Sequence, residues 1–314
     1  MGKNKVVSIL LATHNGEKFL EEQLESLLKQ TYTGFTVYIS DDCSTDFTSK
    51  IISKYCIMDS RFIDIHNSQP FGNARDNFLS MLSQIDSDLY MFCDQDDVWL
   101  PNKIEKMINA YTRECNDEIP SLVYCDMKIV DENLEVLHKS NQAYMGTTLE
   151  VHDFLYYLTA NNIAGCSMLI NKKLADMFRV NTSVFNLTTI IMHDFFFAQL
   201  ASIAGKIIYV NESLQLYRQH GSNAVGANKK CFPSYIIEKL NIKNSKNQLI
   251  KCEKQLQEIL KIPRITDFEK EKLDICIKFS HLYKKRKFTR ISFFIKNHLF
   301  KGNILQKFYQ LLKI

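Results

Sequence analysis

The sequence predicts an α/β domain built on a mainly parallel β-sheet, followed by a basic, mostly helical C-terminal extension. Continuous apolar runs such as residues 6–12 have the hydrophobicity expected of buried parallel strands. Between these runs apolar residues recur at helical spacing, as Leu20, Leu24 and Leu27 do after the first run. Strands that alternate with helices in this way are typical of α/β folds.

The predicted elements follow one another in a regular order. Strands are expected at residues 6–12, 36–40, 62–66, 89–93, 121–127, 164–169 and 206–210. Helices are expected after residue 19, around residues 51–55, and at residues 74–84 and 195–204. Turns separate them, among them Asn15-Gly16 and the glycine-containing loop at residues 67–73. In such a sheet, ligands bind at the carboxyl ends of the strands.

Composition sets the class of protein. The chain has 314 residues, 46% of them hydrophobic and 24% charged, which suffices for one large domain or one domain with an appendage. No apolar run reaches 18 residues, so we expect no transmembrane helix. The basic N-terminus and its apolar run predict a first strand rather than a signal peptide. Nine cysteines without a C-x-x-C pair favour the reducing cytosol over a zinc site or a disulfide framework.

The net charge of +4 conceals an asymmetry along the chain. Residues 229–314 carry 21 Lys and Arg against 7 Asp and Glu, whereas residues 1–228 carry 18 against 28. We therefore predict a boundary near residue 228, with domains at 1–228 and 229–314. From residue 281 onward nine basic residues and many aromatic ones stand without a single acid, which suits an interfacial helix on an anionic membrane. The alternatives are a solvated helix packed on the domain and, less favoured because no such motif is present, nucleic-acid binding.

Polar side chains follow three of the predicted strands. They are Thr13, His14, Asn15 and Glu17 after the first strand, Asp41 and Asp42 after the second, and Asp94, Gln95, Asp96 and Asp97 after the fourth. Carboxylate oxygens suit Mg²⁺ or Mn²⁺, and a cation would let such an acidic cleft accept phosphate. The alternative is an Asp-rich turn that caps a helix near residue 100. No G-x-G-x-x-G or P-loop pattern occurs, which argues against a dinucleotide enzyme and a P-loop NTPase.

Together these motifs resemble the family 2 glycosyltransferases of the GT-A fold, over about residues 5–225. The motifs that carry the resemblance are I-L-L-A-T-H-N-G at 9–16, I-S-D-D-C-S-T-D at 39–46, the N-x4-G-N-A-R-D-N run at 67–77, C-D-Q-D-D-V-W-L-P at 93–101, G-C-S at 165–167, H-D-F-F-F at 193–197 and Y-R-Q-H-G-S-N at 217–223. The D-Q-D-D-V-W, H-D-F-F and Y-R-Q-H-G-x-N forms are most similar to the bacterial rhamnosyltransferase branch. Those enzymes build cell-surface polysaccharide from dTDP-rhamnose.

The resemblance implies a role for individual residues of the nucleotide site. It implies that Thr13, Asn15 and Glu17 line the pocket, that Asp41 or Asp42 meets the base, that Arg75 lies near the phosphates or base, and that Asp94 faces the ribose with Gln95 beside it. The alternative for Arg75 is a surface ion pair with Asp76 or Asp42.

The resemblance also implies the catalytic groups. Asp96 would bind Mn²⁺ or Mg²⁺ as the last residue of the D-x-D motif, while Asp97 shapes the turn. His220 would be a further metal or diphosphate contact, or else a surface or capping histidine. Asp194 matches the general base of the family, and it could also cap the helix at 195–204.

The predicted function is a metal-dependent, inverting glycosyltransferase. We expect it to move a sugar, rhamnose from dTDP-rhamnose, to a lipid-linked or growing cell-surface polysaccharide, working in the cytoplasm at the inner face of the membrane. One alternative is the same fold with a UDP-hexose or UDP-N-acetylhexosamine donor. Another is a catalytically silent sugar-nucleotide-binding assembly subunit, against which the presence of both Asp96 and Asp194 argues.

Overall fold

A computed structural model describes residues 5–147, 153–221, 242–263, 265 and 269–300. The chain divides into two compact units, which are described separately. The first comprises Met1–Val151, Asn162–Thr182 and Gly205–Ala224, and the second comprises His152–Asn161, Ser183–Ala204 and Val225–Ile314. The boundary predicted near residue 228 lies outside the described residues, and the division into 1–228 and 229–314 stays a prediction.

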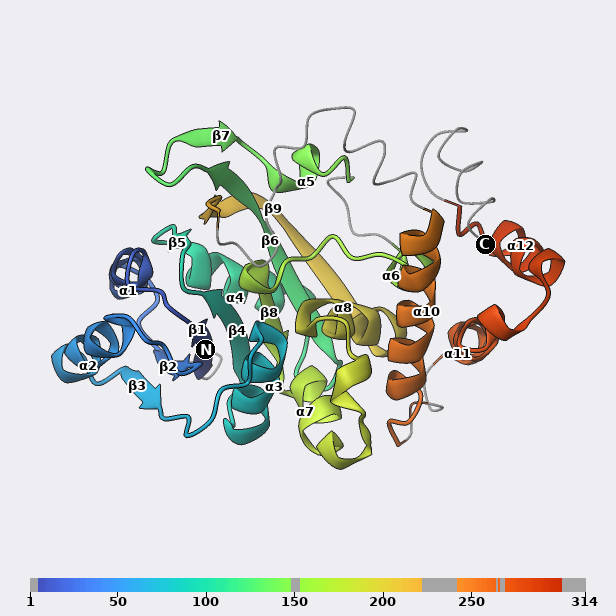
Figure 1. Cartoon of the computed structure of the whole chain (residues 1–314), viewed down its shortest axis with the longest axis horizontal. Helices are drawn as coiled ribbons and strands as arrows, with labels where there is room; N and C mark the ends of the chain where they lie inside the picture. Colours follow the sequence, from blue (N-terminus) through green and yellow to red (C-terminus); the bar gives the residue numbers. More distant parts are fainter. Residues whose placement is uncertain (1–4, 148–152, 222–241, 264, 266–268, 301–314) are drawn as a thin grey trace. The chain divides into compact units, whose positions relative to one another are not determined.

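The first unit is built on one mixed sheet (Figure 1). Its strands are β1 (Val7–Thr13), β2 (Phe35–Asp41), β3 (Phe62–Ile65), β4 (Leu89–Asp94), β5 (Val98–Trp99), β6 (Ser121–Val130), β7 (Val136–His138), β8 (Met168–Asn171) and β9 (Lys206–Arg218). Their order in the sheet is β3-β2-β1-β4-β8-β6-β9-β5, with β7 paired to β6.

The N-terminal half of the sheet is parallel, as the sequence predicts. β1 pairs in parallel with both β2 and β4, and β2 pairs in parallel with β3. All seven residues of β1 are buried, which explains its continuous apolar run. β8 lies antiparallel between β4 and β6, and β6 and β9 pair in parallel. The result is an α/β fold with a mainly parallel sheet, as expected.

Helices flank this sheet. They are α1 (Leu20–Leu28), α2 (Thr48–Met58), α3 (Ala74–Gln84), α4 (Lys103–Glu114), the short α5 (Asn141–Tyr144) and α7 (Lys172–Arg179). Leu20, Leu24 and Leu27 of α1 are fully buried and belong to the same core as β1. Burying a leucine stabilises the fold by about 2 kcal/mol, so this stripe fixes the helix on the sheet.

One predicted strand differs in the structure. Residues 164–169 were expected to form a strand, but Gly165–Ser167 form a 3₁₀ helix and β8 starts at Met168. The hydroxyl of Ser167 donates to the carbonyl of Ala164 at 2.8 Å, a local bond that favours a turn over a ladder.

The second unit is helical in the part that the structure describes. Its helices are α6 (Phe154–Tyr157), α8 (His193–Ala204), α10 (Ile242–Ile259), α11 (Lys270–Phe279) and α12 (Lys287–Lys296), with 3₁₀ turns at Leu187–Thr189 and Leu282–Lys284. Gln255 of α10 is fully buried; it accepts from the Ile191 N–H at 2.7 Å and donates to Gln199 of α8 at 3.1 Å. The predicted helical C-terminal region is thus confirmed. None of the helices in the described ranges is long and apolar enough to cross a membrane.

Candidate active site

The polar turns predicted from the sequence meet at one edge of the sheet. The register places Thr13 beside Asp41 and Ala12 beside Asp94. The carboxyl ends of β2, β1 and β4 therefore lie side by side in the first unit. This is the edge at which parallel α/β sheets bind ligands.

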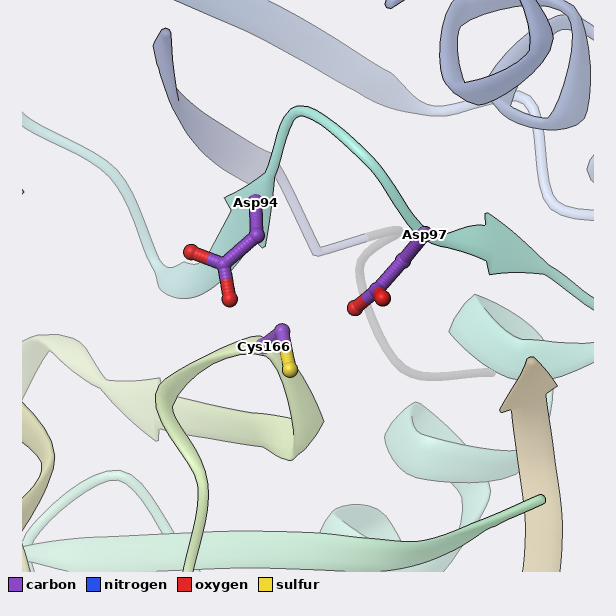
Figure 2. A group of neighbouring side chains, drawn as sticks. All are labelled: Asp94, Asp97 and Cys166. Carbon is purple, nitrogen blue, oxygen red and sulfur yellow. The ribbon is translucent and has the colours of Figure 1, made fainter. Parts of the chain in front are cut away.

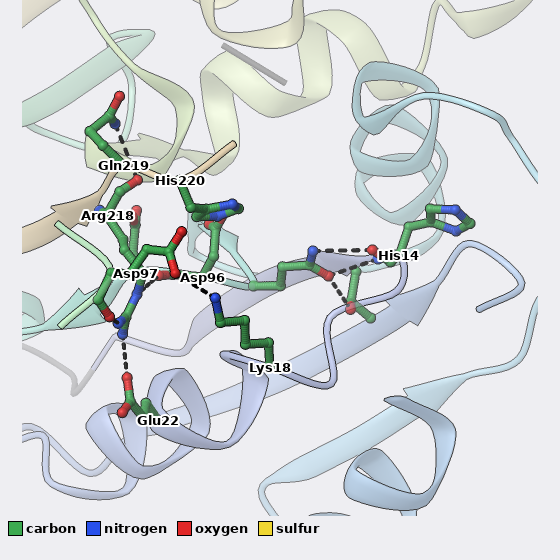
Figure 3. Close-up of polar contacts among 11 residues, drawn as sticks. His14, Lys18, Glu22, Asp96, Asp97, Arg218, Gln219 and His220 are labelled. Carbon is green, nitrogen blue, oxygen red and sulfur yellow. Dashed lines mark hydrogen bonds and ion pairs between the residues drawn. The ribbon is translucent and has the colours of Figure 1, made fainter. Parts of the chain in front are cut away.

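Gln95 ties the turn after β4 to the turn after β1. The hydroxyl of Thr13 donates to Gln95 Oε1 at 2.5 Å, and the His14 N–H donates to the same oxygen at 2.8 Å. The Gln95 amide in turn donates to the His14 carbonyl at 3.1 Å (Figure 3). Thr13 and Gln95, both predicted to bind the nucleotide, thus form one rigid wall of the site.

Asn15 and Glu17 join the first turn to the second. Asn15 has a left-handed backbone, with a φ of 48°, and its Oδ1 accepts from the Thr45 N–H at 2.9 Å. Glu17 Oε2 accepts from the Phe47 N–H at 2.9 Å. Both side chains are exposed, so they can reach a ligand while they hold these loops together.

The two acids after β2 bind the protein's own backbone. Asp41 accepts from the Ser44 N–H at 3.0 Å. Asp42 is buried and accepts from the N–H groups of Phe71 and Gly72, the latter at 2.9 Å. Asp42 thereby fixes the loop before α3.

Arg75 forms an ion pair with its neighbour Asp76, one of the two partners expected if Arg75 does not contact the donor. Its Nε donates to Asp76 Oδ1 at 2.7 Å and its Nη2 to Oδ2 at 3.0 Å, and the Arg75 hydrogen bonds hold the pKa of Asp76 below its usual range. Its predicted contact with the donor stays a prediction.

Asp94 and Asp97 face Cys166 (Figure 2); Asp97 and Cys166 are buried and Asp94 is partly buried. Their ligand atoms lie within 4.8 Å of one another, close enough to hold a metal ion. Burial and the neighbouring Asp96 raise the pKa of Asp94 to about 7 and that of Asp97 well above its ordinary value. Burial likewise raises the pKa of the Cys166 thiol.

A buried lysine supplies the positive charge of this group. Lys103 is fully buried, lies 3.5 Å from the ring centre of Trp99 and donates to the Cys166 carbonyl at 2.6 Å and to Gln215 Oε1. The Gln215 amide donates to Asp97 Oδ2 at 3.0 Å. Asp97 is therefore part of a satisfied internal network, and we do not assign a metal to it.

Asp96 and His220 form the outer pair of the acidic turn. His220 Nε2 lies 2.7 Å from Asp96 Oδ2, and the two side chains are 8% and 13% exposed. Their position is shown in Figure 3. The two residues predicted to bind a metal are thus in direct contact, although 124 positions separate them in the sequence.

Asp194 lies in the second unit, in the first turn of α8. Its Oδ1 accepts from the Phe195 N–H at 2.5 Å. A carboxylate in the first turn is stabilised by the positive end of the helix dipole.

Three residues of the site region were missed in the sequence. Lys103, Gln215 and Arg218 are fully buried polar residues whose bonds hold the acidic turn. Arg218 stands within the Y-R-Q-H-G motif, which was the available signal. For Lys103 and Gln215 the local sequence carries no such signal, because their partners lie far away in the chain.

The first unit has the GT-A fold of glycosyltransferases. The chain belongs to glycosyl transferase family 2, whose model matches residues 8–178. The dTDP-rhamnosyl transferase RfbG of Shigella flexneri is 30% identical over 226 residues, which cover 69% of this chain and 74% of the relative. The protein is therefore a glycosyltransferase.

Solved structures share the fold. S. aureus TarS 1-349 in complex with UDP-GlcNAc has a TM-score of 0.58 at 16% identity, covering 98% of this chain and 79% of that one. The mannosyltransferase PcManGT from Pyrobaculum calidifontis, in complex with GDP-Man and Mn²⁺, has a TM-score of 0.55 at 11% identity, with the same two coverages.

Proposed function

We propose that the protein is a metal-dependent, inverting glycosyltransferase that moves rhamnose from dTDP-rhamnose to a lipid-linked or growing cell-surface polysaccharide. The observation that carries the metal-dependent site is the Asp96–His220 pair at the carboxyl end of β4. The likeness to a dTDP-rhamnosyl transferase supports the donor.

The Asp96–His220 pair suits a divalent cation. It offers one carboxylate oxygen and one imidazole nitrogen 2.7 Å apart, beside further acids. Mn²⁺ accepts both kinds of ligand, and Mg²⁺ accepts the carboxylate together with substrate phosphate oxygens. When bound, the cation would act as a Lewis acid that neutralises charge on the departing diphosphate.

Asp194 is the proposed general base. The acceptor hydroxyl oxygen forms a bond to C1 of the sugar, the bond from C1 to the nucleotide diphosphate breaks, and the hydroxyl proton passes to the Asp194 carboxylate. Attack from the face opposite the leaving group inverts C1. General-base catalysis contributes about 10²–10⁴-fold, so Asp194→Asn should lower turnover by that factor and leave the donor Kd unchanged. Near-normal transfer by Asp194→Asn would show that another group is the base.

Asp96→Ala tests the cation site. We expect dTDP binding, measured by calorimetry, to lose its dependence on Mn²⁺. Asp274→Ala, which removes an exposed carboxylate in α11, is the matched control. If Asp96→Ala and the wild type give the same Mn²⁺ titration, Asp96 is not a ligand.

A donor screen separates dTDP-rhamnose from the alternative donors, a UDP-hexose or a UDP-N-acetylhexosamine. Thermal unfolding is followed with each nucleotide sugar in Mn²⁺ and in Mg²⁺, because a ligand that binds the folded state raises the Tm. We expect the largest rise with dTDP-rhamnose, followed by transfer to a lipid-linked acceptor. A larger rise with a UDP-sugar would reassign the donor.

The acceptor proposal includes peripheral contact with the inner face of the cell membrane through α12. Residues 281–300 contain six Lys and Arg and no acid. Phe288 and Ile295 stand on one face of α12, seven residues apart, and are 83% and 58% exposed. The opposite side is anchored by buried Phe294. An exposed apolar face flanked by cations is the pattern of a helix that binds an anionic lipid surface.

Liposome co-sedimentation tests this contact. Each Lys or Arg near an anionic surface contributes about 1 kcal/mol, so Lys285→Gln with Lys287→Gln should lower partitioning about 30-fold on phosphatidylglycerol vesicles. Phe288→Ala should also weaken it, whereas Ile57→Ala, at an equally exposed apolar position of the first unit, should not. Equal partitioning of all variants would refute the role of α12.

A further inference from the structure

The guanidinium of Arg218 is buried, and each of its three nitrogens donates a hydrogen bond. It is 1% exposed although it stands at the last position of β9. Its Nε donates to the Asp96 carbonyl at 2.8 Å, its Nη1 to the Glu132 carbonyl at 2.5 Å and its Nη2 to the Glu22 carboxylate. Three segments that are remote in sequence thus converge on one planar group (Figure 3).

The backbone of Arg218 also binds the acidic turn. The Arg218 N–H donates to Asp97 Oδ1 at 3.1 Å. The main chain at Asp96 and the side chain at Asp97 are therefore both bonded to the same residue. Because His220 follows two positions later, this attachment sets where the imidazole meets the Asp96 carboxylate.

Phe19 forms a platform for the same groups. The Arg218 guanidinium carbon lies 4.5 Å from the Phe19 ring centre, and the His220 ring centre lies 4.7 Å from it. Phe19 itself is 8% exposed and is held at the start of α1. A guanidinium stacks on an aromatic face and forks its donors in one plane, which an ammonium group cannot reproduce.

We infer that Arg218 is a positioning residue that acts, together with the Phe19 ring, to hold His220 against Asp96 in the geometry that a divalent cation requires. The inference rests on the proposed cation-binding role of that pair. Arg218 touches neither donor nor acceptor in this scheme. It fixes the backbone on both sides of the pair, so that the ligands are already in place when a cation arrives.

A double-mutant cycle tests the inference, with Mn²⁺ alone as the probe and its Kd measured by calorimetry. We expect Arg218→Lys to fold and to weaken Mn²⁺ binding at least tenfold, as His220→Ala does. The double variant should bind no more weakly than His220→Ala alone, because both changes act through the same contact. Glu22→Gln is the matched control, because it alters only the half-exposed partner of Arg218. Its Kd for Mn²⁺ should stay within threefold of the wild-type value.

Two outcomes would overturn the positioning role. One is a wild-type Mn²⁺ affinity in Arg218→Lys. The other is a double variant whose fold-loss of Mn²⁺ affinity equals the product of the fold-losses of the two single variants. If Arg218→Lys does not fold, Phe19→Leu replaces it, with the same expectations.

The metal-free protein gives a separate readout. If the wild type binds no Mn²⁺, the proposed cation site is refuted. The double-mutant cycle at positions 218 and 220 is then measured as changes in Tm in the absence of metal. Coupled Tm changes at positions 218 and 220 would then support the positioning contact alone, whereas additive changes would refute it.

Discussion

His193, next to the proposed base Asp194, should make the folded protein sensitive to acid. Its side chain is only 4% exposed, at the start of α8. Burial lowers the pKa of this imidazole from 6.5 to about 3. Below pH 6.5 the unfolded chain therefore binds a proton that the folded protein does not bind, so the stability from this site is complete above pH 6.5 and is lost as the pH falls toward 3.

The size of the loss follows from the two pKa values. Each pH unit between them is worth about 1.4 kcal/mol of unfolding free energy. At pH 5, which lies 1.5 units below the unfolded value, the predicted loss is about 2 kcal/mol relative to pH 8. His193→Phe keeps a large buried ring and removes the titrating group, so this part of the pH dependence should disappear.

Urea unfolding followed by circular dichroism at pH 5 and pH 8 measures the effect. The free-energy difference between the two pH values should be about 2 kcal/mol smaller in His193→Phe than in the wild type. His281→Gln removes an exposed histidine from the same unit and should retain the wild-type difference. An unchanged difference in His193→Phe would refute the argument that this buried imidazole stays neutral.

Three glycines give further predictions. A Cβ at Gly205 would lie 1.8 Å from the carbonyl oxygen of Pro120, a backbone atom that cannot move aside, so Gly205→Ala should cost about 3 kcal/mol in urea unfolding. Gly221→Ala meets nothing within 4 Å and should cost less than about 0.5 kcal/mol, and equal costs would contradict the packing argument. At Gly16 a Cβ would lie 2.4 Å from Gln95 Oε1 and 2.8 Å from Thr13 Oγ1, the two side chains that form the rigid wall, so Gly16→Ala should lower the Tm. Because it displaces Gln95 from the nucleotide wall, it should weaken dTDP binding about tenfold by calorimetry, and an unchanged Kd would remove Gln95 from that site.

The parallel half of the sheet could be predicted because its signals are local. The apolar run of β1 and the acids that follow β2 and β4 are visible in short windows of sequence, and parallel pairing then brings the polar turns to one edge. The antiparallel strand β8 could be predicted only in part, because the 3₁₀ turn at Gly165–Ser167 depends on the hydrogen bond from the Ser167 hydroxyl to the Ala164 carbonyl.

The inner network could not be predicted, because burial of a charge leaves no local trace. Lys103 stands on α4, where a lysine ordinarily lies in solvent, and only the packed fold brings Gln215 and the Cys166 carbonyl to it. The sequence motifs predict Asp96 and His220 as metal ligands but do not place them in contact. Their contact depends on β9 pairing with β5 immediately after the acidic turn.

The pairing of β5 with β9 also has a consequence for how the site forms during folding. Asp97 is hydrogen-bonded to Gln215 and Arg218, which lie 118 and 121 positions later in the chain. Asp96 contacts His220, which lies 124 positions later. Contacts of such sequence separation close large loops and form late. A nascent chain that already contains the whole family-matched segment, residues 8–178, would carry the acidic turn at residues 94–97 but still lack Gln215, Arg218 and His220. The contact between Asp96 and His220, which we propose binds a cation, would therefore form only when β9 is in place.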